Sequence, residues 1–283
     1  MSYIQLALIA LVQGITEWLP ISSSAHVLLA ADFFGAKGRD ELLINAVSNL
    51  GTLAAMLIYF RKDVASAVIG GFELVAAPVT KAPLSSGARL ALCIVVATPF
   101  ALGMVLVSEK LLPEGVQEVL RGNYVVAGAT IFFGALLWWA DSSGSRTRKE
   151  EDMTLMHAFI IGAMQAVAAI IPGTSRSGIT MTAARALGYE RTEAARISML
   201  IGAPIMAAAG LYGAYGLMSA EAAGEGMLTL ADGMIVAGIA FVSGLASIWM
   251  LMSLLERMSF LPFVIYRFIL GAVLLAMSPL MFG

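Results

Sequence analysis

The sequence predicts an all-α polytopic membrane protein, with about six crossings and two re-entrant helical hairpins arranged as an inverted repeat. Of its 283 residues, 59% are hydrophobic and 13% are charged, and the mean hydropathy is +0.87. That composition is too apolar for an ordinary soluble domain. Apolar runs at 91–107, 124–140 and 234–255 are close to or above the ~20 helical residues that cross a bilayer. Two other apolar segments are broken by prolines and serines, which favours re-entrant hairpins.

The first broken segment spans residues 2–35. Gln13 and Glu17 are four residues apart and would share one face of a helix. Pro20 should stop that helix, and the serines at 22–24 should cap a second helix that carries His26. We do not expect a cleaved signal peptide here, because the segment carries Gln13 and Glu17 and has no basic leader.

The remaining chain alternates apolar crossings with polar connections. A loop is expected at 37–41, and the mixed segment 61–86 is expected to include an interfacial helix. A second loop is expected at 108–121, and the most hydrophilic one covers 141–152. The predicted crossings are 43–60, 88–107, 122–140, 195–217, 231–254 and 261–282.

The second broken segment, 154–188, contains the sequence PGTSRSGIT at 172–180. Its Arg176 lies in surroundings that are otherwise free of charge, where an ionised group costs at least ~2.5–3.5 kcal/mol. A connecting loop that happens to hold an arginine is the simpler interpretation. We favour an anion site, because a guanidinium, hydroxyls and amide groups would gather at a helix start. The hydroxyls are those of Ser175, Ser177 and Thr180.

The two broken segments resemble each other. Gln13 and Pro20 recur at one common offset as Gln165 and Pro172, and the same offset places Ser23 opposite Ser175 and Ser24 opposite Arg176. Each half would hold one hairpin and three crossings, so the second half would enter from the opposite side. We therefore expect a single membrane domain, 1–283, with repeats at about 1–140 and 154–283 joined by a hydrophilic cytoplasmic loop, 141–153.

Orientation follows from the basic loops. By the crossing count, 61–88 and 141–153 lie on one side and hold most loop Lys and Arg, whereas 217–232 lies opposite with none. The positive-inside rule places the first two segments in the cytoplasm. The first hairpin would then enter from the outside and the second from the cytoplasm.

Four stretches carry a family resemblance: QGITEWLPISSSAH, PGTSRSGIT, LGTLAAMLIYFRKD and SFLPFVIYRFILG. Together they closely resemble the undecaprenyl-diphosphate phosphatase family of bacterial inner-membrane enzymes, associated with bacitracin resistance. The resemblance implies hydrolysis of undecaprenyl diphosphate to undecaprenyl phosphate and inorganic phosphate, which recycles the lipid carrier for peptidoglycan synthesis. It also implies a divalent cation, Mg²⁺ or Ca²⁺, and a site open to the periplasmic side. Gln13 is a departure, since the family often has Glu there.

These residues form a coherent set for diphosphate chemistry. Arg176 can clamp phosphate oxygens, and Glu17, with Gln13, can hold a hard cation. Ser23 or Ser24 could attack phosphorus or only bind it, and direct attack by water stays open. We favour Ser23 as the nucleophile and His26 as the general base or acid.

Structural alternatives accompany each of these roles. Glu17 and Arg176 could form a structural ion pair, His26 could be a core histidine, and the serines could be helix caps. His157 is expected to be incidental. Three other arginines are expected to reach the membrane interfaces by snorkelling: Arg185, Arg196 and Arg267.

A secondary transporter or flippase for an anionic lipid or solute is the rival class, because inverted repeats with broken helices are common among transporters. A transporter needs an anion clamp but no nucleophile and histidine beside a metal carboxylate. The expected partners are a polyprenyl diphosphate lipid and the bilayer, with no nucleic acid, and an oligomer is possible.

Overall fold

The computed structural model describes residues 3–26, 39–80, 83–143, 147–222 and 229–282. Within these ranges the chain is helical, and the only extended pairing is an isolated bridge between Arg148 and Tyr189. The helices are α1 (Tyr3–Thr16), α3 (Arg39–Tyr59), α4 (Arg61–Thr80), α5 (Ser86–Leu111), α6 (Glu114–Arg121), α7 (Asn123–Ser142), the 3-10 turn η1 (Glu150–Asp152), α8 (Leu155–Ile170), α9 (Arg176–Ala186), α10 (Arg191–Ala222), α11 (Leu230–Leu255) and α12 (Leu261–Phe282). Residues 23–26 are also helical.

The described helices are suited to a bilayer. Four are long and apolar enough to cross it, namely Ser86–Ser108, Asn123–Ser142, Arg191–Ala222 and Leu230–Leu255. Shorter apolar helices cover Tyr3–Thr16, Ile44–Tyr59, Leu155–Ile170 and Leu261–Met277. Large apolar side chains such as Val95, Phe132 and Trp249 are more than half exposed, as lipid-facing residues are. The prediction of an all-α polytopic membrane protein is confirmed.

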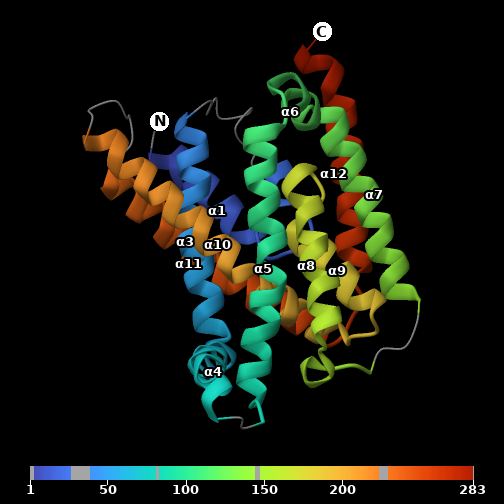
Figure 1. The fold of residues 1–283 in the computed structure, drawn as a ribbon. Helices are drawn as coiled ribbons and strands as arrows, with labels where there is room; N and C mark the ends of the chain where they lie inside the picture. Colours follow the sequence, from blue (N-terminus) through green and yellow to red (C-terminus); the bar gives the residue numbers. More distant parts are fainter. Residues whose placement is uncertain (1–2, 27–38, 81–82, 144–146, 223–228, 283) are drawn as a thin grey trace.

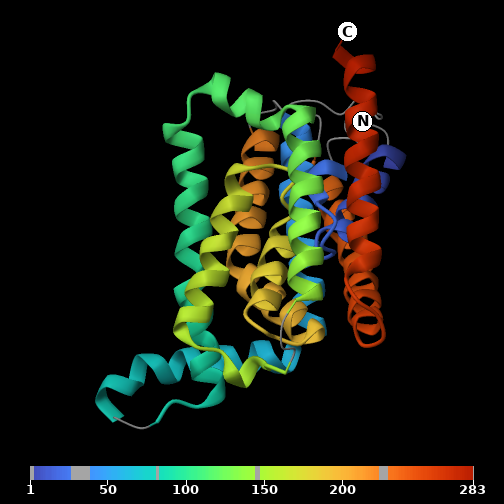
Figure 2. The same ribbon diagram turned by 90° about the vertical axis from the view of Figure 1, so that its right-hand side faces the viewer.

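The hydrophilic segments gather at the ends of the bundle. Helix α4 lies across one end, in the position expected of an interfacial helix, and η1 lies at that same end (Figures 1 and 2). Both chain termini, α6 and the ends of α10 and α11 that flank 223–228 lie at the other end (Figure 1). The relative placement of the basic segments 61–88 and 147–153 thus agrees with the crossing count.

The prediction of a loop over 108–121 is wrong for all but residues 112–113, because α5 continues to Leu111 before the loop and a further helix follows it. Helix α6 occupies Glu114–Arg121, starting after Pro113 and ending at Gly122. A proline is favourable before a first helical turn because its missing N–H is not needed there. Of the predicted loop at 37–41, residues 37–38 lie outside the described residues, and the prediction is wrong for the rest, because α3 begins at Arg39.

The broken segments pack in corresponding ways. Helix α1, which opens the first, packs against α11, and α8, which opens the second, packs against α5. Helices α7 and α12, the last of each predicted repeat, pack against each other. Trp18, fully buried after the end of α1, donates from Nε1 to the Thr52 carbonyl on α3 at 3.0 Å. These contacts hold residues 17–24, where the first broken segment turns, inside the helix bundle. This stretch is called the first turn below.

Two of the three arginines expected to snorkel are buried instead. Arg185 is 1% exposed and its Nε lies 2.9 Å from Oδ1 of Asp141, which also pairs with Arg191. Arg267 is 0% exposed and donates to backbone carbonyls. The third, Arg196, is partly buried and pairs with Asp63 and Glu193. The prediction failed because these guanidinium groups find acceptors inside the protein, where snorkelling is unnecessary.

Candidate active site

The second turn, residues 171–177, joins the end of α8 to the start of α9 through a short non-helical stretch. Gly173 has a φ of +88°, and a Cβ there would collide with the Val126 carbonyl on α7. Ser175 also has positive φ, 67°, and its Oγ accepts from the Gly178 amide at 3.1 Å. This N-cap starts α9, so the helix begins at Arg176 with its first amides toward the turn.

The first turn is built in the same way. Ser22 has a φ of 73°, and its Oγ lies 3.2 Å from Ser24 Oγ. In the second turn, Ser175 Oγ lies 3.2 Å from Ser177 Oγ. The equivalent pairs are therefore Ser22 with Ser175 and Ser24 with Ser177, which places Ser23 opposite Arg176.

This geometry corrects the predicted register by one residue. The sequence offset had matched Ser23 with Ser175 and Ser24 with Arg176. It was taken from the glutamines and prolines, but the second turn has one more residue between proline and cap serine. Positive φ at each cap serine marks the true correspondence.

The two turns contact each other directly. The Gly173 amide of the second turn donates to Ser24 Oγ of the first at 3.2 Å. In return, Ser177 Oγ lies 3.0 Å from the Leu19 carbonyl and 3.3 Å from the Glu17 carbonyl, and it donates to them. The second serine of each turn thus bonds the backbone of the other turn.

An ion pair lies where the turns meet. Arg176 Nη2 is 3.0 Å from Glu17 Oε1, and the two side chains are only 16% and 10% exposed. The Arg176 guanidinium also stacks over the Trp18 ring, 5.1 Å from its centroid, an attractive arrangement for a cation. On α10, Gly202 leaves the room that the guanidinium fills, since a Cβ at that position would overlap Arg176 Nη1.

Amide side chains adjoin the Glu17 carboxylate. Gln13 Nε2 donates to Glu17 Oε2 at 2.7 Å and to Asn49 Oδ1 at 3.2 Å. Gln13 is 2% exposed and its Oε1 has no hydrogen-bond partner. An orphaned oxygen beside a carboxylate and a second amide is a donor set that suits a hard cation. No cluster of three or more His, Cys, Asp or Glu side chains is found in the described ranges, so such a site relies on amide oxygens.

Arg267 is the residue that sequence reasoning missed. From α12 it donates to the carbonyls of Thr130 at 2.9 Å, Pro20 at 3.2 Å, Gly173 at 3.1 Å and Thr174 at 3.0 Å. One guanidinium therefore ties both turns to α7. The available signal was its position: a single arginine in the apolar stretch 261–282.

The predicted phosphate-binding hydroxyls fall into two groups, those without a hydrogen bond to a described residue and those hydrogen-bonded within the protein. Ser23 is half-buried and makes no hydrogen bond to any described residue, whereas Ser24 accepts from the Gly173 amide. Ser177 and Thr180 are 2% and 1% exposed. Thr180 Oγ1 lies 2.8 Å from the Arg176 carbonyl and 2.6 Å from Ser198 Oγ. In this arrangement, Ser177 and Thr180 hold the turns and α9 in place.

His26 is bonded at both ring nitrogens. Nδ1 lies 2.8 Å from the Ser22 carbonyl, and Nε2 lies 2.6 Å from the Tyr266 hydroxyl of α12. The structure therefore forms no direct hydrogen bond between His26 and Ser23. The other histidine, His157, bonds the Tyr189 hydroxyl at 2.8 Å, away from both turns.

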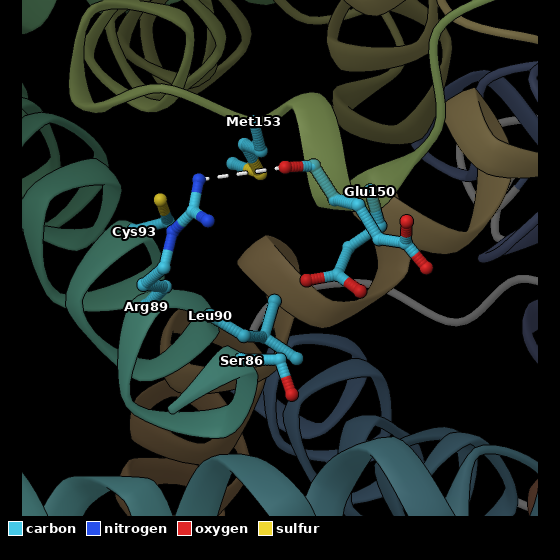
Figure 3. A pocket seen from close by; sticks show the side chains of 7 residues that line it. Ser86, Arg89, Leu90, Cys93, Glu150 and Met153 are labelled. Atoms are coloured by element: carbon cyan, nitrogen blue, oxygen red, sulfur yellow. Dashed lines mark hydrogen bonds between the residues drawn. The ribbon is translucent and has the colours of Figure 1, made fainter. Parts of the chain in front are cut away.

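An apolar groove of about 400 Å³ runs beside the first turn, with His26 on its wall. The other described residues that line it are Val12, Ile15, Thr16, Leu19, Ile21, Leu254, Pro262, Phe263 and Tyr266. A second pocket, of about 230 Å³, lies between the start of α5 and η1 (Figure 3). None of the predicted site residues lines this second pocket. Arg89 there donates to the Glu151 carbonyl at 3.4 Å, and burial raises the pKa of the Glu150 carboxyl.

Comparisons with known proteins show the family to which the chain belongs. The chain matches the family described as "Bacitracin resistance protein BacA" over residues 6–273. It is 68% identical over 283 residues to an undecaprenyl-diphosphatase of Hyphomonas neptunium, covering 100% of this chain and 99% of the relative. It is also 45% identical to an undecaprenyl-diphosphatase of Maricaulis maris, covering 97% of this chain and 98% of that protein. Both broken turns and Arg267 lie inside the region that the family model matches, and the chain belongs to the BacA bacitracin-resistance family.

Proposed function

We propose that this chain hydrolyses undecaprenyl diphosphate to undecaprenyl phosphate and inorganic phosphate in the bacterial inner membrane. The reaction returns the lipid carrier to peptidoglycan synthesis and underlies bacitracin resistance. Support comes from the family match and from curated relatives named undecaprenyl-diphosphatase. The substrate is a lipid, and the apolar groove beside the first turn offers its tail a place next to the site.

The Glu17–Arg176 pair carries this proposal. Without substrate, each charge satisfies the other in apolar surroundings. A diphosphate can replace Glu17 on Arg176, because a guanidinium binds phosphate oxygens through two parallel N–H groups. The start of α9 adds amide groups and the positive end of a helix dipole. The carboxylate released by this exchange is then available to a cation.

Glu17, Gln13 and Asn49 would hold that cation. Their oxygens fit Mg²⁺ or Ca²⁺, and the orphaned Gln13 Oε1 gains a partner when the amide turns. The bound cation supplies positive charge to the phosphate oxygens as negative charge develops. Because Gln13 brings no charge of its own, Glu17 remains the anionic ligand of the set.

Ser23 is the nucleophile we favour, because its hydroxyl is not committed to another group in the described structure. Its oxygen would bond to the terminal phosphorus, the P–O–P bridge would break, and undecaprenyl phosphate would leave. The serine proton would pass to His26, and water would then release phosphate from the serine. Direct attack by water on the terminal phosphorus, with Ser23 as a ligand, is the alternative route.

Phosphate release by the purified chain tests the function. Undecaprenyl diphosphate in detergent micelles should yield inorganic phosphate with Mg²⁺ or Ca²⁺ present, and EDTA should abolish the release. Glu17→Gln should reproduce the EDTA result at any cation concentration. Gly238→Ala is the matched control, because a Cβ there meets nothing within 4 Å.

Two outcomes would contradict these assignments. Substrate binding without phosphate release by the unmodified chain would favour a transporter. Full activity in Glu17→Gln, together with tighter metal dependence in Gln13→Glu, would show that the cation ligands are assigned wrongly.

A further inference from the structure

Tyr266 makes the shorter of the two hydrogen bonds to the His26 ring. Its hydroxyl lies 2.6 Å from His26 Nε2, and the two rings stack with centroids 5.5 Å apart and planes 5° apart. The residues come from opposite ends of the chain, directly after the first turn and in α12. Tyr266 also precedes Arg267, which fixes this part of α12 against both turns.

The two hydrogen bonds of His26 define its protonation pattern. The Ser22 carbonyl can only accept, so Nδ1 must carry a proton and donate to it. In a neutral imidazole the lone pair is then on Nε2, which accepts the Tyr266 hydroxyl proton. Among the described residues that line the surrounding groove, His26 and Tyr266 are the only titratable ones, and none is a carboxylate or a lysine or arginine. This apolar lining favours the neutral ring.

We propose that Tyr266 is a positioning residue that holds His26 neutral, with its basic nitrogen, Nε2, directed into the apolar groove. The effect on turnover rests on the proposed function, in which His26 accepts a proton, but the hydrogen-bond pattern does not. The hydroxyl occupies the place on Nε2 that a reacting hydroxyl takes during turnover. Stacking limits rotation of the ring, so this exchange does not disturb the Nδ1 bond to Ser22.

Tyr266→Phe separates the hydroxyl from the ring, because it removes the hydrogen bond and keeps the stacking. We expect kcat for phosphate release to fall about tenfold, part of what an oriented general base contributes, with KM little changed. Tyr212→Phe is the control, since Tyr212 is 76% exposed and lies outside both turns. Thermal unfolding of the variant should match the unmodified chain, which separates positioning from loss of the fold.

The histidine can also be observed without any assay of activity. The chain has only two histidines, so ¹⁵N-histidine labelling in a His157→Gln background leaves the two nitrogens of His26 alone in the spectrum. We expect a protonated Nδ1 and a hydrogen-bonded Nε2, and in Tyr266→Phe the Nε2 resonance should move toward that of a free imidazole nitrogen.

The ¹⁵N spectrum and the kinetic measurement test different parts of the proposal, so each can contradict it independently. An Nε2 resonance that is unchanged in Tyr266→Phe would overturn the proposal. So would a shifted resonance with an unchanged kcat, or a variant with normal kcat and raised KM. If the unmodified chain releases no phosphate while Nε2 responds to Tyr266→Phe, the proposed function fails and the positioning of His26 stands.

Discussion

At the scale of single residues, each charged group of the site is paired with a protein group that a ligand can replace. Glu17 and Arg176 satisfy each other at 3.0 Å, and Gln13 completes the carboxylate's hydrogen bonds. Placing these groups in an apolar bundle is costly unless each has a partner. Bringing in an anion and a cation together would separate the pair without leaving either side chain unpaired. The geometry therefore suits a ligand that carries both.

Arg176→Lys should abolish most phosphate release. The ammonium keeps the positive charge but loses the planar fork and the stacking on Trp18. We expect kcat/KM to fall at least about 100-fold, as for loss of a strong transition-state contact. The measurement is steady-state phosphate release, and turnover close to that of the unmodified chain would remove Arg176 from the site.

The serines can be distinguished by the parameter that each one changes. If Ser23 attacks phosphorus with His26 as base, Ser23→Ala and His26→Ala should each lower kcat by ~10²–10⁴-fold, and the double variant should lose little more. Ser24→Ala should act mainly through the contact with Gly173. A Ser23→Ala variant that raises KM and keeps kcat would instead make the serine a ligand and water the attacking group.

At the scale of helices, backbone proximity decides where the charged side chains can lie. Gly173 lets the second turn approach α7, and Gly202 lets α10 approach the Arg176 guanidinium. Prolines inside the long helices are tolerated, with Pro99 in α5 and Pro204 in α10, because neighbouring helices re-satisfy the backbone. The two glycines thus matter because they leave space for the site, and not because they make the backbone flexible.

Gly202→Ala tests this use of space. The added methyl would overlap Arg176 Nη1, so the guanidinium must leave its place beside Glu17. We expect phosphate release to fall about 10-fold or more, while thermal unfolding changes little because the side chain can move toward the turn. Gly238→Ala on α11 is the control, with an unobstructed Cβ. Equal activity of the two variants would mean that the position of the guanidinium is not critical.

At the scale of the whole molecule, the hydrophilic segments separate to the two ends of the bundle (Figure 1). Helix α4 and η1 share one end, and the termini share the other (Figures 1 and 2). The positive-inside rule assigns the first end to the cytoplasm. A site open to the periplasm depends on that assignment.

Cysteine labelling in intact cells checks the orientation. With Cys93 replaced to remove background, a cysteine at Ser142 should resist a membrane-impermeant thiol reagent, and one at Ala222 should react. Both positions are exposed at helix ends, so access to the reagent is decided by the membrane. The reverse labelling pattern would invert the topology and place the site on the cytoplasmic side.

The sequence predicted the helical class, both broken segments and the importance of Glu17 and Arg176, because prolines and lone charges in apolar runs are strong local signals. The ion pair between these two residues was only the structural alternative to their predicted roles. It could not show that Ser177 and Thr180 turn inward to bond the backbone, since a hydroxyl can equally bind a phosphate or a carbonyl. The predicted register of the two turns was wrong by one residue. The positive φ angles that mark the true register occur at Ser22 and Ser175, and a sequence signals positive φ clearly only where it has glycine. Pairing of His26 with Tyr266 joins residues 240 positions apart, beyond the reach of local patterns. The predicted boundaries of the two repeats, at about 1–140 and 154–283, stay a prediction.

The contacts of Arg267 have a consequence for how the protein is made. Its guanidinium supplies hydrogen bonds to Pro20, Gly173 and Thr174, yet it belongs to α12, which follows all the other described helices along the chain. Until that helix is inserted, the carbonyls of both turns lack this donor inside the membrane, and an unsatisfied polar group there is costly. A nascent chain that stops after α11 would thus contain both serine turns, Glu17 and Arg176, and still have no assembled site. Activity should therefore arise only once α12 has been inserted beside both turns.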